Sequence, residues 1–145
     1  MVIRKIQSID TLSLRQEILR PRSEISACLF AGDDDRSTAH FGAVHNDTIV
    51  GIVSVYKRSN PTICSEQGYQ LRAMATAANV RGQGIGLKLL EAAERYAAQN
   101  NSNYIWANAR TTALGFYKKA GYIAESQEFA IKAIGPHYLV RKNLA

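Results

Sequence analysis

The sequence of residues 81–86 is Arg-Gly-Gln-Gly-Ile-Gly. It follows an apolar run at 69–76 and opens an amphipathic run at 84–99, so the pattern predicts a strand, a loop and a helix. The first amides of a helix have no partner within it, and the helix dipole adds partial positive charge there. Because glycines let the backbone approach a ligand closely, this segment predicts a site for an anion such as a pyrophosphate, with Arg81 beside it.

Two better-known phosphate loops do not fit this segment. The Walker pattern needs Gly-Lys-Ser/Thr five positions after its first glycine, where this chain has Leu87 and Lys88. The dinucleotide fingerprint G-x-G-x-x-G fails because Leu87 occupies its last position. The alternative interpretation is a tight turn without a ligand, but one glycine would suffice for that turn.

The remaining pattern predicts one α/β (α+β) domain over residues 1–145. It has a mixed sheet with helices packed on its faces. Asp10 is expected to cap the first helix, Pro21 to stop it, and Gly121 to cap the last helix in the left-handed conformation. The expected strands are 2–6, 39–45, 48–56, 69–76, 104–108, 122–129 and 138–142, and the expected helices are 10–19, 84–99 and 112–120.

Composition narrows the classes of partner. Lys and Arg outnumber Asp and Glu by 18 to 12, but these cations are scattered, which argues against a nucleic-acid surface. No apolar run is long enough to span a membrane, and no signal peptide is visible, so neither a membrane nor secretion is expected. Cys28 and Cys64 are predicted to be free thiols of a cytoplasmic protein. His40 and His45 point to opposite faces of a strand, and no metal site is predicted.

Three segments together resemble the GNAT superfamily, the Gcn5-related N-acetyltransferases. Residues 81–86 match its Gln/Arg-x-x-Gly-x-Gly/Ala signature, residues 71–76 look like its central strand, and residues 113–122 resemble its later Phe-Tyr helix. The resemblance covers nearly the whole chain and implies a mixed, mostly antiparallel central sheet flanked by helices. One departure is Ala77-Ala78, where many members carry an acidic residue followed by Pro.

The resemblance implies that acetyl-CoA is the cosubstrate and that an amine attacks it directly. Backbone groups of the central strand would pair with the pantetheine arm, the loop amides would hold the pyrophosphate, and an amide near Met74 could stabilise the oxyanion. The residues implied to bind the cofactor are Met74, Ala75, Thr76, Arg81, Gly82, Gln83, Gly84, Ile85, Gly86, Leu87, Asn108 and Tyr117.

Tyr117 and His137 are the candidate catalytic residues. Tyr117 matches the family's frequent general acid, which would protonate the leaving thiolate; the alternative is a tyrosine that only packs on the sheet. Many members carry a carboxylate base where this chain has Gln70. His137 could replace it as a base and contact the substrate, or be a turn histidine. Glu66 could act there too, or lie solvated in a loop.

The acceptor is expected to be a primary amine of a small molecule or peptide, and charge leaves its nature open. Arg22 is the candidate that could bind an anionic group of the substrate. Glu24, Asp33 and Asp34 could instead attract a cationic amine. The rival function is an acyl-CoA-binding or sensing module without turnover. The family's paired use of C-terminal strands would also allow a homodimer.

Overall fold

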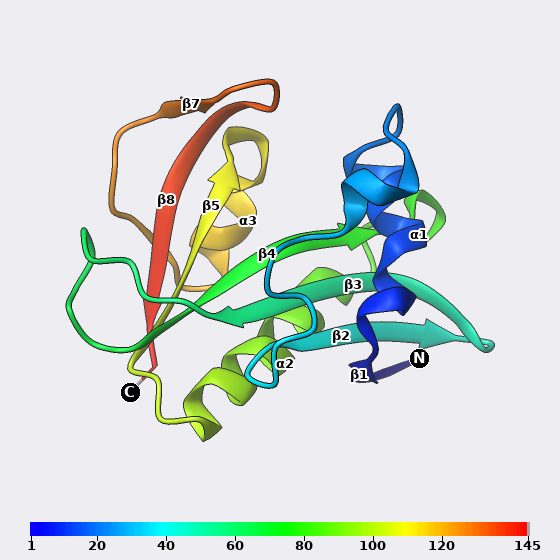
Figure 1. Cartoon of the computed structure of the whole chain (residues 1–145), viewed down its shortest axis with the longest axis horizontal. Helices are drawn as coiled ribbons and strands as arrows, with labels where there is room; N and C mark the ends of the chain where they lie inside the picture. The colour runs from blue at the N-terminus through cyan, green and yellow to red at the C-terminus, as the bar shows by residue number, and fades with distance from the viewer. Residues whose placement is uncertain (145) are drawn as a thin grey trace.

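A single twisted sheet of eight strands organises the chain (Figure 1). The computed structural model describes residues 1–144. The strands are β1 (Val2–Ile6), β2 (Ala39–His45), β3 (Thr48–Lys57), β4 (Gly68–Thr76), β5 (Tyr104–Arg110), β6 (Ile123–Ala124), β7 (Phe129–Ile131) and β8 (Gly135–Asn143). The helices are α1 (Leu12–Leu14), α2 (Ile85–Gln99) and α3 (Leu114–Lys119), with helical turns η1 (Ser8–Thr11), η2 (Arg15–Leu19), η3 (Ile25–Cys28), η4 (Ala78–Val80) and η5 (Thr111–Ala113).

The strand order is β1-β2-β3-β4-β5-β8-β6, and β7 pairs with the first three residues of β8. Only β4 and β5 run parallel; every other neighbouring pair is antiparallel. The expected mixed, mostly antiparallel sheet is therefore confirmed. The parallel pair requires a crossover, and α2 provides it.

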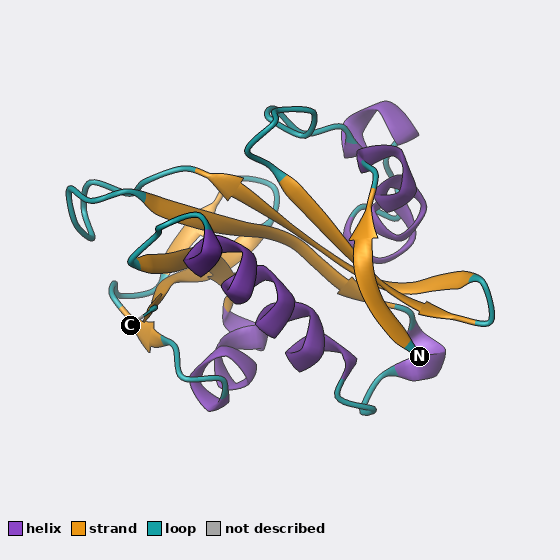
Figure 2. Ribbon diagram, turned by 90° about the horizontal axis from the view of Figure 1, so that it is seen from below, coloured by secondary structure: helices purple, strands orange, loops and turns teal. Residues whose placement is uncertain are grey.

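The two faces of the sheet are covered by different elements, as Figure 2 shows. Alternate residues of β3 face opposite sides. Val53 and Val55 belong to the large core that includes Leu89 of α2, whereas Ile52 packs in a smaller core with Leu14 of α1. The helical turns at the N-terminus thus lie on the face opposite to α2.

The N-terminal helix differs from the regular helix expected over residues 10–19. It begins as a 3₁₀ turn, becomes α-helical at Leu12, and widens at its end, where the Arg20 amide donates to the Arg15 carbonyl at 3.0 Å. Asp10 lies inside the first turn and accepts a hydrogen bond from the Gln7 amide at 3.0 Å. It therefore acts as the inner partner of a capping box and not as the cap itself.

The strand expected over residues 122–129 is divided into β6 and β7. Between them, the Ser126 hydroxyl accepts the Leu139 amide at 3.0 Å, where a continuous strand would offer a carbonyl. The intervening residues 125–128 are all polar and carry no alternating apolar pattern, so the sheet gains little by continuing there. β8 starts at Gly135, earlier than expected, because β7 pairs with its first three residues.

Three observations bear on partners of this fold. Cys28 is buried and Cys64 is partly exposed, and both are free. Over residues 1–144, no helix is long and apolar enough to cross a membrane. In the same range, no three His, Cys, Asp or Glu side chains gather in a way that could hold a metal ion.

Candidate active site

The strands β4 and β5 separate in the middle of the sheet. Their register covers only three pairs and ends at Gln70 and Trp106. Beyond these residues the edge of β4 that faces β5 has no strand partner, so backbone donors and acceptors are free along it. A bulge accompanies the separation, because β3 and β4 change register between Ile52 and Ser54, and Ala73 has a left-handed φ of 58°.

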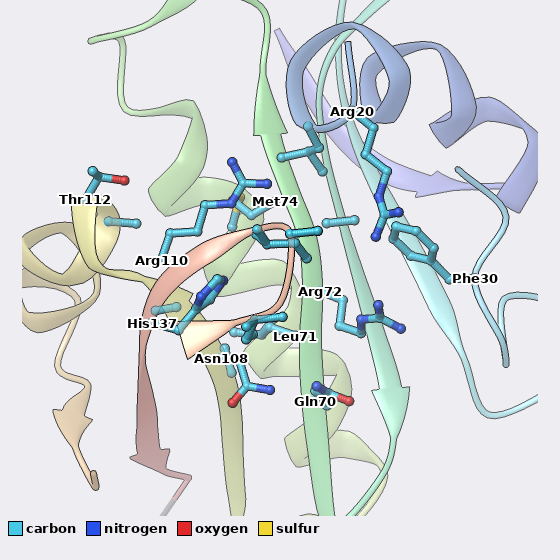
Figure 3. Close-up of a pocket in the computed structure, with 18 of the residues that line it drawn as sticks. Arg20, Phe30, Gln70, Leu71, Arg72, Met74, Asn108, Arg110, Thr112 and His137 are labelled. Atoms are coloured by element: carbon cyan, nitrogen blue, oxygen red, sulfur yellow. The ribbon is translucent and has the colours of Figure 1, made fainter. Parts of the chain in front are cut away.

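A cleft of about 810 Å³ lies on this opening. Figure 3 shows residues from separate parts of the chain around it. Its walls come from residues 70–74 of β4, 107–110 of β5, 112–113 and 116–117 at α3, 19–23 with Phe30 near the N-terminus, and 131–134 with His137 at the β7–β8 turn.

The glycine loop forms the N-terminal end of α2, as the sequence predicts. Gly82 and Gly84 have left-handed φ values of 81° and 76°, and Gly84 is the residue that caps the helix. A side chain at either position would meet no atom within 4 Å, so backbone conformation and not space requires glycine. Lys88 is the first residue of the helix whose amide bonds back, to the Gly84 carbonyl at 3.3 Å. The amides of 85–87 are thus free, and the loop fits an anionic group.

Gly86 has a different role from the other two glycines. Its φ is not left-handed, but an added Cβ would lie 3.3 Å from the ring of Phe116. The glycine therefore lets α3 pack against the beginning of α2. This contact fixes the helix that carries Tyr117 relative to the loop.

The predicted donor residues fall into three groups. Met74 lines the cleft from β4, and Asn108 faces it from β5. Ala75 is buried in the small core under α1, so only its backbone can serve a ligand. The segment 81–87 follows β4 and η4 in the chain and opens α2, and none of its residues lines the cleft. The open strand edge and the free amides thus belong to consecutive segments, an order that fits an extended arm ending in a pyrophosphate.

Tyr117 lies on α3 and lines the cleft while its ring is buried. The ring packs edge-on against Phe116 and Tyr122, each at 5.3 Å between centroids. Burial raises the pKa of Tyr117 to about 12, so the hydroxyl stays protonated at neutral pH. Such a group can donate a proton or a hydrogen bond but cannot serve as a base.

His137 lines the cleft from β8 and is 3% exposed. Its Nδ1 lies 2.8 Å from the Gly135 carbonyl oxygen, which can only accept, so Nδ1 carries the proton. Its ring lies near that of Phe129, at 6.1 Å between centroids. The neutral tautomer set by this contact has its lone pair on Nε2, which suits a proton acceptor.

Glu66 and Gln70 are placed differently from each other. Glu66 is exposed in the β3–β4 loop, accepts a hydrogen bond from Asn103 at 3.0 Å, and does not line the cleft. The structure therefore does not bring it to the other candidate residues. Gln70 does line the cleft, and its amide oxygen accepts from Arg58 at 2.8 Å.

Several cleft residues were not singled out from the sequence. Phe30, Arg72, Arg110 and Lys132 all line the cleft. Arg72 carries a detectable signal, because it is two residues after Gln70 on one strand and so shares its face. The others come from loops or strand ends whose position no local pattern specifies. Arg22, which was predicted, lines the cleft as well.

Comparisons with known proteins agree with this architecture. The model of the Acetyltransferase (GNAT) family matches residues 4–122. The Bacillus subtilis (strain 168) protein described as uncharacterized N-acetyltransferase YitI is 32% identical over 142 residues, which cover 98% of this chain and 95% of the relative.

Solved structures share the fold. An aminoglycoside 6'-N-acetyltransferase complexed with coenzyme A has a TM-score of 0.80 at 15% identity, with 100% of this chain and 98% of the other covered. A putative N-acetyltransferase from Lactobacillus plantarum has a TM-score of 0.80 at 19% identity over the whole of both chains. The family model, the curated relative and the splayed sheet agree, and the chain belongs to the GNAT family of N-acetyltransferases.

Proposed function

We propose that this enzyme transfers an acetyl group from acetyl-CoA to a primary amine of a small molecule or peptide, by direct transfer between two bound substrates. The observation that carries the proposal is a set of four features, three of which lie at the cleft. The cleft holds the open edge of β4, a protonated tyrosine and a histidine with a free Nε2. The fourth feature is the free amides of residues 85–87 in the first turn of α2, which follows β4 in the chain.

The donor is held mainly by backbone groups in this proposal. The amides of Gly82, Gln83, Gly84, Gly86 and Leu87 bind the pyrophosphate, and Arg81 and Ile85 complete the loop. The backbone of Met74, Ala75 and Thr76 pairs with the pantetheine arm, which Asn108 meets from β5. Bound acetyl-CoA supplies an activated thioester carbonyl, which an amine can attack.

The chain then contributes positioning and proton transfer. Holding amine and thioester in one cleft removes the entropic cost of a bimolecular encounter. A β4 amide near Met74 stabilises the charge that develops on the carbonyl oxygen. His137 takes a proton from the amine at Nε2, and Tyr117 donates its proton to the leaving thiolate. With Gln70 at the position of the usual carboxylate, we assign the base to His137, the one histidine among the described residues that line the cleft.

The two free cysteines suit the location that we propose for this enzyme. Cys28 is buried and Cys64 partly exposed, and neither is bridged. Thiols of this kind persist in a reducing compartment. We therefore place the enzyme in the cytoplasm, and fractionation of cells that express a tagged chain tests this.

The test is release of CoA from acetyl-CoA, measured with a thiol reagent over a panel of primary amines. Turnover with at least one amine, and its loss in Tyr117→Phe together with His137→Gln, is the expected result. Tight acetyl-CoA binding with no release for any amine would instead support the acyl-CoA-binding module. Mass spectrometry of the product identifies the acetylated nitrogen.

A further inference from the structure

All five charged side chains that line the cleft are cationic. They are Arg20, Arg22, Arg72, Arg110 and Lys132. No aspartate or glutamate of residues 1–144 lines it. Such one-sided charge in a concave site raises the local concentration of anions and disfavours polycations.

Two of these arginines share one aromatic ring. The guanidinium carbons of Arg20 and Arg72 lie 5.2 Å and 4.5 Å from the centroid of the Phe30 ring. Figure 3 shows the three side chains together on one side of β4. Stacking on an aromatic ring orients a guanidinium while its N–H groups remain free to bind an anion.

These cations have no carboxylate partner of their own. Over residues 1–144, the ion pairs involve only Arg15, Arg141 and Lys142 as cations. Arg72 is also partly buried, and this burial lowers the pKa of its guanidinium. Repulsion from Arg58 and Arg15 acts in the same direction, and Tyr56 and Asp33 offset the effect only in part. An unpaired, partly desolvated cation is unfavourable, so a bound anion would be stabilised here.

The acidic residues that could have reversed this conclusion are engaged or directed elsewhere. Asp33 is bonded to Arg15 at 2.7 Å and to Tyr56, beneath the N-terminal turns. Asp34 accepts from the Ser8 hydroxyl at 2.6 Å. Glu24 is exposed and does not line the cleft. The sequence leaves open whether the acceptor site is cationic or anionic, and the structure favours a cationic site.

The arginine pair is separate from the donor loop. Arg20 and Arg72 lie with Phe30 on the side of the N-terminal segment, whereas Arg110 and Thr112 lie across β4 on the side of α3 in Figure 3. None of residues 81–87 lines the cleft. The pyrophosphate of the donor therefore does not account for Arg20 and Arg72.

We propose that the acceptor is an amine that also carries an anionic group, a carboxylate or a phosphate, and that Arg20, Arg22 and Arg72 bind this group beside Phe30. The planar guanidinium fork matches two oxygens of either group. This inference rests on the proposed acetyltransferase function and names the class of its acceptor.

The test compares amines that differ only in the anion. Lysine with cadaverine tests a carboxylate, and O-phosphoethanolamine with ethanolamine tests a phosphate. We expect kcat/KM to be about 10- to 100-fold higher for the anionic member of at least one pair. The pair that shows the preference identifies the group. Equal or better turnover of both amines without an anion overturns the inference and leaves the acetyltransferase function standing.

Variants assign the preference to the arginines. Arg72→Gln should remove most of it, and Arg22→Glu, at an exposed position that keeps the fold, should shift turnover towards the cationic amine. Arg36→Gln, an exposed arginine outside the cleft, should change nothing. An unchanged preference in both Arg72→Gln and Arg22→Glu would contradict the assignment.

A binding measurement tests the anion subsite even if no amine is acetylated. If no amine in a broad panel releases CoA, the proposed function fails, and calorimetry still tests the anion subsite. Wild-type protein should bind Nε-acetyl-lysine more tightly than N-acetylcadaverine, and Arg72→Gln should abolish the difference. The second pair, N-acetyl-O-phosphoethanolamine and N-acetylethanolamine, tests a phosphate in the same way. Equal binding within both pairs by the wild type would refute the subsite without reference to turnover.

Discussion

Tyr117 is buried and lines the cleft from α3. Its raised pKa of about 12 keeps the hydroxyl protonated at any pH at which the protein is studied. We expect Tyr117→Phe to lower kcat by about 10²- to 10⁴-fold, because the leaving thiolate loses its proton donor. The pH–rate profile of the wild type should show no ionisation of this group below about pH 11, as its folded pKa requires.

Tyr122 provides the matched control for this prediction. Its ring packs against that of Tyr117, but its hydroxyl donates to Glu94 at 2.8 Å. Tyr122→Phe should cost about 1 kcal/mol of stability and leave kcat unchanged. Full activity in Tyr117→Phe would remove Tyr117 from the mechanism, and steady-state kinetics on both variants decides.

His137 is expected to accept the proton of the attacking amine at Nε2, because its Nδ1 is engaged by the Gly135 carbonyl. His137→Gln should lower kcat/KM by about 10²- to 10⁴-fold, while thermal unfolding reports whether the fold is retained. His45→Gln, at an exposed end of β2, is the control and should leave kcat/KM unchanged. An unchanged kcat/KM in His137→Gln would mean that the amine loses its proton to water.

The part of α2 that we propose to bind acetyl-CoA is its first turn, which Gly84 caps. Gly84 has a left-handed φ of 76° and open space around its missing side chain. Gly84→Ala should cost about 1–2 kcal/mol of backbone strain. If the loop changes conformation to relieve this strain, acetyl-CoA should bind roughly 5- to 30-fold more weakly. Calorimetric titration with acetyl-CoA and CoA measures this directly.

A second helix glycine, Gly115, is the control that distinguishes the effect of backbone strain from the effect of replacing a glycine. Gly115 of α3 has ordinary helical φ and no atom within 4 Å of an added Cβ. Gly115→Ala should therefore stabilise the protein by about 0.5–1 kcal/mol and leave donor affinity unchanged. Equal donor affinity in Gly84→Ala and the wild type would show that the amide array does not bind the pyrophosphate.

Regular elements were predictable wherever one physical pattern dominates. The helix 84–99 was found as α2 within one residue because its apolar face repeats with the helical period. The helix cap at Gly121 was confirmed by its φ of 97° and by the Tyr122 amide, which donates to the Tyr117 carbonyl. The prediction of one continuous strand over 122–129 is wrong. The Ser126 hydroxyl takes the place of a backbone acceptor for the Leu139 amide, and the sequence near Ser126 has no pattern that predicts such a side-chain contact.

A buried polar network links distant parts of the molecule. Arg15, fully buried in the N-terminal turns, donates to Asp33, to the Cys28 carbonyl, and to Ser54 and Tyr56 of β3. Ser54 also contacts His40. This network ties the segment that carries Arg20 and Phe30 to the sheet, and so fixes one wall of the cleft.

Because of this network, we expect the free energy of unfolding to depend on pH in the acidic range. Burial alone would raise the pKa of Asp33, but hydrogen bonds from Arg15, Tyr56 and the Phe30 amide hold it at about 2, below its ordinary 3.8. The stabilisation by the folded carboxylate is thus complete above about pH 4 and is lost as the pH falls towards 2. Asp33→Asn should lower the free energy of unfolding by about 3–5 kcal/mol, because it leaves Arg15 buried without a countercharge.

Chemical denaturation between pH 2 and 7 checks this prediction. The wild type should lose stability between pH 4 and 2, and Asp33→Asn should lack the contribution of Asp33 to that loss. Asp34→Asn, next to it but exposed, should cost about 1 kcal/mol or less. Equal stability of Asp33→Asn and the wild type at pH 7 would contradict the role assigned to the ion pair.

The sequence by itself determined the fold class and the glycine loop that opens α2. Both depend on contiguous residues: a strand at 69–76, glycines at 82 and 84, and the helix that follows. A backbone site of this kind is encoded locally, since it needs only a strand, glycines and a helix start. The tertiary structure alone decided the character of the acceptor side. Arg20 and Phe30 meet Arg72 because the N-terminal segment folds over β4. Asp33 is bound by Arg15, Tyr56 and the Phe30 amide and does not line the cleft. Side-chain charge in a cleft depends on which distant residues are paired, and local sequence does not contain that information.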